Sequence, residues 1–152
     1  MAPVMLIQSN LRLDRAVIRR AIEEAGNADD SLVVLAVLDP AIAEKVATQF
    51  AESGDIGRRP SEGFLSSLYE RHEELALRQA DEIIQDGREA GVAVEAAVRR
   101  GDYARETADA IRRIRPATVV IEKKRRSLLR SATGDEFIHR LRHTEGFNLV
   151  EV

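Results

Sequence analysis

The run Leu32–Leu38, LVVLAVL, constrains the fold more than any other stretch of this chain. Its residues are apolar without interruption, whereas a strand with one face in water alternates apolar and polar side chains. The Asp39-Pro40 pair that follows is a stop signal. A strand that is covered on both faces is typical of a parallel sheet between two layers of helices, so we expect an α/β protein.

The rest of the chain alternates short apolar runs with segments of helical periodicity. Strands are predicted at 4–8, 32–38, 92–98, 117–121 and 147–152. Helical patterns lie between them, at 17–25, 41–53, 65–87, 104–114 and 137–141. This succession predicts a single doubly wound, five-stranded parallel sheet of order 3-2-1-4-5, with helices on both faces.

Length and composition indicate one folded domain over residues 1–152, since 44% of the residues are hydrophobic and 32% are charged. The turn-rich segment GDIGRRPSEG predicts a flexible insertion at about 53–63. There is no cysteine, which excludes disulfides, thiolate nucleophiles and cysteine metal sites. The amino end has no targeting pattern, and no run reaches the roughly 18 apolar residues of a membrane span, so we expect a cytoplasmic protein.

The charges are divided unevenly along the chain. Residues 99–143 hold 13 Lys or Arg against 6 Asp or Glu, while the remainder holds 10 against 20. A nucleic-acid partner is disfavoured because no aromatic side chain lies between Val119 and Arg130 to stack on a base, and the net charge is −3. A membrane partner is disfavoured because Leu128 and Leu129 form too short an apolar face.

A ligand of such a sheet binds beyond the carboxyl ends of the strands, where the winding direction reverses. With the order 3-2-1-4-5 this point lies between the first and fourth strands. The segments there are Gln8-Ser9-Asn10 and the loop that begins at Glu122, in the stretch VVIEKKRRSLLRSATGDEF. The basic loop is therefore a candidate anion site because of its position as well as its charge. The alternative interpretation is a solvated loop whose charges are compensated by Glu122 and by neighbouring acidic helices.

Several segments together resemble the universal stress protein family. They are the turn VEAAVRRGD that leads into ARETADAIRRI, the strand TVVI, a long loop into a short helix, and a chain that ends in its fifth strand. The resemblance extends over nearly the full chain. It implies a small cytoplasmic binding or regulatory protein, of a family that includes nucleotide-binding and non-binding members, and a homodimer that pairs through the last strand, Phe147–Val152. That strand is a short, apolar sheet edge, which favours such pairing.

The family's ATP-binding motif is degraded in this sequence. ATP-binding members carry a glycine after the fourth strand, a second glycine three residues on, and a Gly-Ser or Gly-Thr pair at the next helix, so that backbone N–H groups reach the phosphates. Here Glu122 and Arg125 stand at the first two places, and Asp135 follows the matching Gly134. Gln8 replaces the acidic residue that the family carries after the first strand.

The start of the last helix also argues against a phosphate cradle. Thr133 and Glu136 have the spacing of a capping box, which uses the first free N–H groups of the helix. Asp135 and Glu136 place negative charge at the positive helix end, where a phosphate would otherwise be stabilised. We therefore expect a universal-stress-type binding or regulatory protein that does not use the glycine loop for ATP, with no cofactor required.

The alternative hypothesis is an ATP- or AMP-binding stress-response switch, with Mg, in which basic side chains hold the phosphates. Its nucleotide would lie in the crevice between the first and fourth strands. The candidate residues are Gln8, Ser9, Asn10, Asp39, Gly101, Lys123, Lys124, Arg125, Arg126, Arg130 and Gly134.

No catalytic constellation is visible in the sequence. There is no G-x-S-x-G elbow and no Ser-His-Asp arrangement. His139 and His143 are spaced for a weak zinc site with Glu136, but a pair of surface histidines is the better interpretation, and we expect no metal. His72 lies on the apolar stripe of the long helix, where a packed histidine is the usual case. We therefore expect no enzymatic activity.

Overall fold

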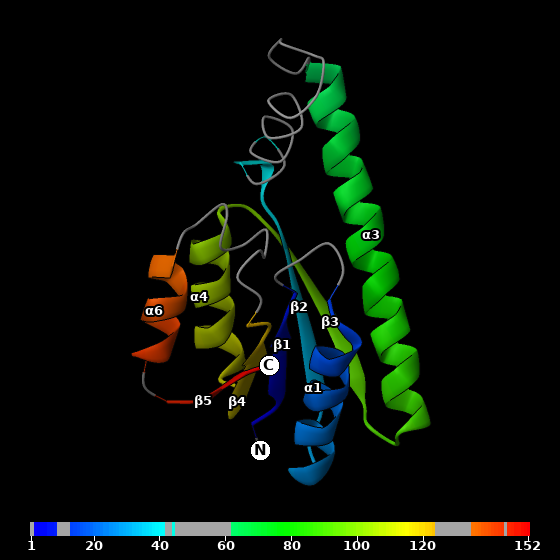
Figure 1. Ribbon diagram of the computed structural model, residues 1–152, viewed down its shortest axis with the longest axis vertical. Coiled ribbons are helices and arrows are strands. Elements are labelled where there is room, and N and C mark those ends of the chain that lie inside the picture. Colours follow the sequence, from blue (N-terminus) through cyan, green and yellow to red (C-terminus); the bar gives the residue numbers. More distant parts are fainter. Residues whose placement is uncertain (1, 9–12, 42–43, 45–61, 124–134, 145) are drawn as a thin grey trace.

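The computed structural model describes residues 2–8, 13–41, 44, 62–123, 135–144 and 146–152. Strands and helices alternate along these residues (Figure 1). The strands are β1 (Val4–Ile7), β2 (Leu32–Leu38), β3 (Val94–Arg100), β4 (Thr118–Ile121) and β5 (Asn148–Glu151). The helices are α1 (Arg15–Asn27), α3 (Glu62–Glu89), α4 (Tyr103–Ile114) and α6 (Asp135–Arg142). No helix in the described ranges is long and apolar enough to cross a membrane.

The five strands form one parallel sheet of order β3-β2-β1-β4-β5, which confirms the predicted order. Strand β1 is central: Val4 pairs with Leu32 of β2 on one side and with Thr118 of β4 on the other. The winding direction reverses at β1, because the chain first proceeds outward through β2 and β3 and later returns to β4 and β5. A ligand crevice is therefore expected at the carboxyl ends of β1 and β4.

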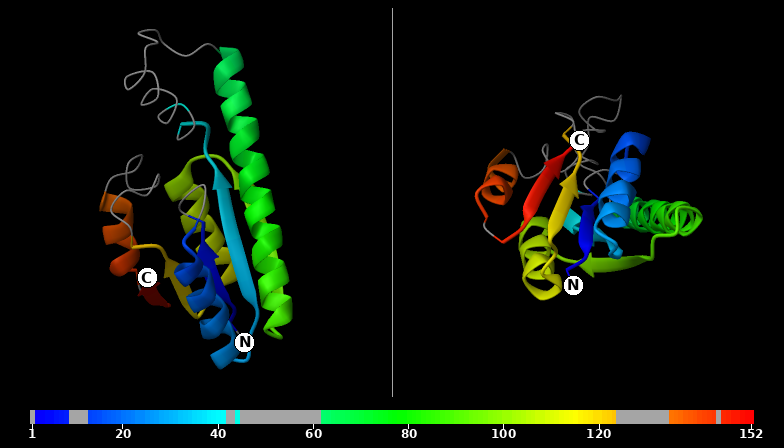
Figure 2. Two further views of the ribbon diagram at one scale, coloured as in Figure 1. Left: turned by 45° about the vertical axis from the view of Figure 1, so that its right-hand side comes forward. Right: turned by 90° about the horizontal axis from the view of Figure 1, so that it is seen from below.

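Helices cover both faces of the sheet. Helices α1 and α3 lie on one face and α4 and α6 on the other (Figures 1 and 2). Alternate residues of each inner strand enter the two cores: Leu6 and Val34 pack with Val17 of α1, whereas Met5 and Leu35 pack with Ala110 of α4. All seven residues of β2 are buried, as its uninterrupted apolar run predicts.

Two boundaries differ from the predicted ones for a physical reason. Strand β3 was expected at 92–98 but runs from Val94 to Arg100, because it pairs with β2 along its whole length, up to Leu38 opposite Arg100. Gly87 and Gly91 were expected to close the long helix; α3 continues past Gly87 and ends at Glu89, two residues before Gly91. A Cβ atom on Gly87 would lie 2.2 Å from Val94 Cγ2, so the glycine permits close packing of α3 on β3.

Most of the helix predicted at 41–53 and nearly all of the insertion predicted at about 53–63 lie outside the described residues. The capping box of Thr133 and Glu136 is also not tested, since Thr133 is not among the described residues.

Candidate functional site

Three polar side chains are buried at the edge of the sheet where β1, β2 and β4 end. Gln8 follows β1, Asp39 follows β2 and Glu122 follows β4, and these residues are 6%, 6% and 3% exposed, respectively. Buried polar groups are uncommon unless they are hydrogen-bonded or serve a site. The structure therefore places three buried polar side chains at the topological switch point, which is where the strand order predicts a ligand crevice.

Gln8 connects the end of β1 to helices on both faces of the sheet. Its side-chain Nε2 donates to Oε1 of Gln79 on α3 at 2.6 Å. Its backbone carbonyl accepts a hydrogen bond from the hydroxyl of Tyr103 on α4 at 3.2 Å. The Gln8 Oε1 atom has no hydrogen-bond partner among the residues that the structure describes. This amide oxygen is an acceptor that a ligand could use.

Asp39 joins the end of β2 to the start of α4. Its Oδ1 accepts from the backbone N–H of Ala41 at 2.8 Å, and its Oδ2 accepts from the backbone N–H of Tyr103 at 2.9 Å. Tyr103 is the first residue of α4, and the N–H groups of a first helical turn have no partner within their own helix. Asp39 therefore has a structural role, in which each of its oxygens accepts a backbone hydrogen bond.

The predicted site residue Gly101 lies at the same helix start. Its φ of +142° is a backbone conformation that favours glycine, and its N–H donates to the Leu38 carbonyl at 3.1 Å. The next residue, Asp102, is the N-cap and accepts from the Arg105 N–H at 2.9 Å. The turn itself thus requires Gly101. Two carboxylates, of Asp39 and Asp102, already compensate the positive end of α4.

The end of β4 carries Glu122 and Lys123. Glu122, which the sequence resemblance places at the first glycine of the ATP loop, is buried, while Lys123 is exposed. The backbone N–H of Lys123 donates to the carbonyl of Val152 at 2.7 Å and so extends the pairing of β4 with β5. This N–H group is therefore engaged within the sheet.

The described structure thus places four of the predicted site residues, which are Gln8, Asp39, Gly101 and Lys123. The others lie outside the described residues; they are Ser9, Asn10, Lys124, Arg125, Arg126, Arg130 and Gly134.

Sequence reasoning missed two residues near this edge, Tyr103 and Gln79, whereas it interpreted His72 as a packed histidine of the long helix. Burial raises the pKa of the Tyr103 phenol, so that its hydroxyl remains a neutral donor to Gln8. Burial lowers the pKa of His72, and the negative charge of Asp39 opposes that shift in part. Tyr103 directly follows the N-cap residue Asp102, and this position in the sequence could have identified it as a residue at the start of a helix near the site. Gln79 lies beside the apolar stripe of α3, and nothing in the local pattern distinguishes it.

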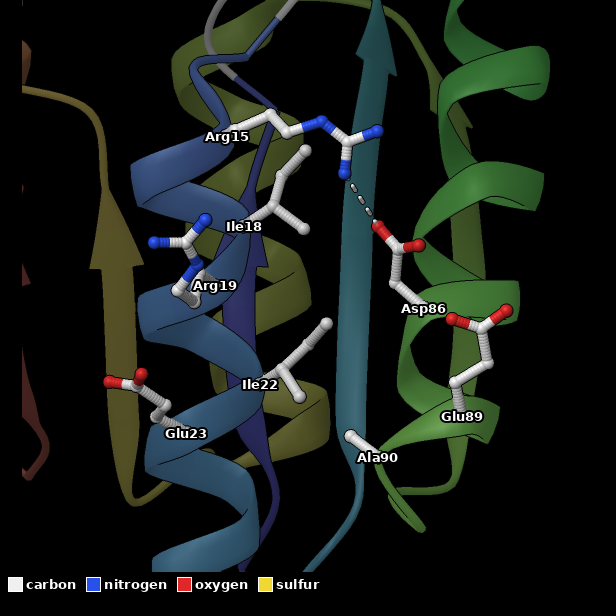
Figure 3. Close-up of a pocket in the computed structure, with 8 residues that line it drawn as sticks. All are labelled: Arg15, Ile18, Arg19, Ile22, Glu23, Asp86, Glu89 and Ala90. Carbon is white, nitrogen blue, oxygen red and sulfur yellow. Dashed lines mark ion pairs between the residues drawn. The ribbon is translucent and has the colours of Figure 1, made fainter.

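Two hollows on the described surface lie away from this edge. One, of about 400 Å³, lies between α1 and α3, where Ile18 and Ile22 point toward α3 (Figure 3). Arg15 and Asp86 form an ion pair across it, with 3.6 Å between Nη1 and Oδ2. The other, of about 450 Å³, lies between α4 and α6. Neither is lined by the buried polar residues at the ends of β1, β2 and β4.

His139 of α6 and His143, which follows the end of α6, contact each other and are exposed. The ring centroids of His139 and His143 are 4.4 Å apart with an edge-on orientation. Within the described ranges, no group of three His, Asp or Glu residues is arranged to hold a metal ion.

Comparisons with known proteins identify the fold. No protein-family model matches the chain, and no curated protein matches its sequence. A universal stress family protein of Burkholderia pseudomallei has a TM-score of 0.62 and 17% identity, over 99% of this chain and 95% of that one. The universal stress protein of Archaeoglobus fulgidus, solved with dAMP, has a TM-score of 0.62 and 15% identity, over 99% and 97%. A family protein of Arabidopsis thaliana, solved with AMP, has a TM-score of 0.58 and 16% identity, over 100% and 91%. The chain therefore has the universal stress protein fold, as its sequence resemblance predicted.

Proposed function

We propose that this protein is a universal-stress-type binding or regulatory protein that acts as a homodimer and does not hold ATP with the family's glycine loop. The observation that carries this proposal is Glu122. It stands after β4, where the resemblance places the first glycine of the ATP loop, and it is only 3% exposed.

Electrostatics and hydrogen bonding at this edge both disfavour a phosphate. A carboxylate at this place would repel a phosphate, and a buried setting strengthens such repulsion. The Lys123 N–H donates to Val152, and the Tyr103 N–H donates to Asp39, so two backbone donors near the crevice are already used. Asp102 adds a further negative charge at the start of α4.

The pairing geometry of β5 supports the proposed homodimer. The N–H group of Asn148 donates to the carbonyl of Ala117, directly before β4, and the N–H group of Val152 donates to the carbonyl of Ile121 in β4. Because successive residues of a strand point their N–H groups to opposite edges, the N–H of Leu149 points away from β4. Phe147 and Leu149 pack against one core, and Val150 and Val152 pack against the other. This packing fixes the position of β5, so that its outer edge can pair with the same edge of a second copy.

A second candidate function is the binding of an adenine nucleotide by side chains alone. The buried Gln8 Oε1, which has no hydrogen-bond partner within the described ranges, favours it, since it could accept a hydrogen bond from an exocyclic amino group. The structures of this fold that were solved with dAMP and AMP also support it. The phosphates would then depend on Lys123 and the basic residues that follow it.

The proposal is tested by purifying the protein without added nucleotide, denaturing it, and identifying released small molecules by mass spectrometry. We expect no stoichiometric nucleotide. Stoichiometric adenine nucleotide would overturn the proposal in favour of the second candidate. In that case, replacing Lys123, Lys124, Arg125 and Arg126 together by Gln should abolish the binding.

A further inference from the structure

The groove between α4 and α6 combines an apolar floor with a basic rim. Its volume is about 450 Å³. The floor is formed by Ala104, Ala108 and Ile111 of α4 and by Leu141 of α6. The three α4 residues follow the spacing i, i+4, i+7, so they lie along one face of the helix. Because two of these side chains are alanines, they fill little of the groove and leave room for a side chain of another molecule.

Arginines border this floor on both helices. Arg105 and Arg112 lie seven residues apart on α4, which is about 10 Å along a helix axis, and Arg140 lines the groove from α6. Asp102 is the one acidic residue among the described residues of the lining. Its carboxylate caps α4 by accepting the Arg105 backbone N–H. The rim is therefore positively charged.

Arg112 shares its nearest carboxylate, that of Asp109, with two other arginines. Arg112 Nη2 is 3.7 Å from Asp109 Oδ1, and its side chain is 74% exposed. Asp109 also pairs with Arg99 at 2.6 Å and with Arg113 at 3.1 Å, and Arg99 pairs in addition with Glu106 at 3.6 Å, so two carboxylates face three arginines. The hydrogen bond from Arg99 is the main cause that holds the pKa of Asp109 below its ordinary value. Excess positive charge thus remains beside the apolar floor.

We infer that the α4–α6 groove is a docking site for an acidic amphipathic helix of a partner protein. The charge of the rim complements glutamates on such a helix, and the apolar floor complements its leucine face. Nucleic acid fits less well, because the described lining holds no aromatic side chain on which a base could stack. This inference does not depend on what binds at the ends of β1 and β4.

The experiment uses fluorescence anisotropy with a fluorescein-labelled amphipathic helical peptide of about 20 residues, with Leu on one face and Glu on both flanks. We expect saturable binding that weakens as salt is added. The Arg105→Gln/Arg112→Gln variant should bind about fivefold more weakly or worse, since rim charges are removed. The matched control Arg78→Gln/Arg88→Gln removes two exposed arginines of α3 and should bind as the unaltered protein does.

A further variant separates groove docking from general charge attraction. Ala108→Lys fills the floor while adding a positive charge, so it should weaken binding if the peptide lies in the groove. Circular dichroism with thermal unfolding checks that each variant is folded. Absence of peptide binding, equal affinity in both double variants, or tighter binding by Ala108→Lys would overturn the inference.

Two other occupants are distinguished in the same experiment. A labelled single-stranded oligonucleotide that binds more tightly than the peptide would contradict the assignment to a protein partner. If the Arg105→Gln/Arg112→Gln variant loses self-association in sedimentation velocity, the groove is an interface between copies of this chain, and the inference is wrong.

Discussion

The carboxylate of Asp39 accepts a hydrogen bond from the backbone N–H of Tyr103 at 2.9 Å, so the end of β2 caps a helix that begins far along the chain. The Tyr103 hydroxyl in turn donates to the carbonyl of Gln8 at the end of β1. These two contacts fix the start of α4 against two adjacent strand ends. The polar edge of the sheet is consequently part of the fold's framework as well as a candidate ligand site.

Replacing Asp39 by Ala should destabilise the fold by about 1–3 kcal/mol, because the N–H groups of Tyr103 and Ala41 lose their acceptor in a buried place. Urea unfolding followed by circular dichroism measures the loss. Asp30→Ala is the matched control, since within the described part of the chain the Asp30 side chain accepts from the adjacent Ser31 N–H alone, in a part-buried position. Equal losses in the two variants would contradict the role assigned to Asp39.

Tyr103→Phe removes only the hydroxyl that donates to Gln8 and should cost about 0.5–1.5 kcal/mol of the free energy of unfolding. Tyr69→Phe is the control, because the Tyr69 hydroxyl accepts from Arg100 in an exposed place. Chemical denaturation should show a clearly larger loss for Tyr103. A loss confined to Tyr69 would show that the Tyr103 contact is unimportant.

Two glycines inside helices should respond to alanine in opposite directions. Gly87→Ala should destabilise by about 1–3 kcal/mol, because the new Cβ would overlap Val94 Cγ2 and lie 3.1 Å from the Val92 carbonyl oxygen. At Gly26 the nearest atom would be 3.6 Å away, so Gly26→Ala should gain up to about 1 kcal/mol from helix propensity. Thermal unfolding tests both signs, and a more stable Gly87→Ala protein would refute the close approach of α3 and β3.

His72 should make the fold less stable in mild acid. Burial lowers its pKa from the ordinary 6.5, so the unfolded chain takes up a proton more readily than the folded one. The free energy of unfolding contributed by His72 is complete above pH 6.5 and is lost as the pH falls through the lower folded-state value. His72→Gln should flatten this slope in urea titrations at a series of pH values. The same flattening in His139→Gln, an exposed site on α6, would contradict the assignment.

Leu149→Pro should dissociate the proposed homodimer, since it removes an N–H group that points to the outer edge of β5. Leu149→Ala is the control, because it loses apolar packing but keeps the N–H. We expect light scattering with size-exclusion chromatography to show a dimer for the unaltered protein and the alanine variant, and a monomer for the proline variant. A proline variant that remains dimeric would place the interface elsewhere.

The fold was predictable because its signals are local and mutually consistent. The uninterrupted run Leu32–Leu38 indicated a doubly covered strand, and the alternation of elements then predicted the strand order. The resemblance to universal stress proteins covered nearly the whole chain and agrees with the fold found. Boundaries were less predictable: the length of β3 is set by its pairing with β2, which no local pattern of residues 92–100 contains.

The candidate site was only partly predictable from the sequence. Gln8 and Asp39 were found because they follow strands that meet at one edge. Gln79 and Tyr103 were missed because they contribute through contacts between distant elements, to Gln8 and to Asp39. Gly101 was predicted as a ligand residue, but its positive φ is enough to explain why a glycine stands at this position.

The proposal that the protein does not hold ATP with the family's glycine loop is tested most directly by calorimetry. The nucleotide-free protein is titrated with Mg·ATP and, separately, with AMP. We expect no saturable heat at micromolar nucleotide concentrations, because Glu122 stands where the resemblance places the first glycine of the ATP loop and the Lys123 N–H donates to Val152. Stoichiometric binding of Mg·ATP with micromolar affinity would contradict the claim and make the basic loop a phosphate site.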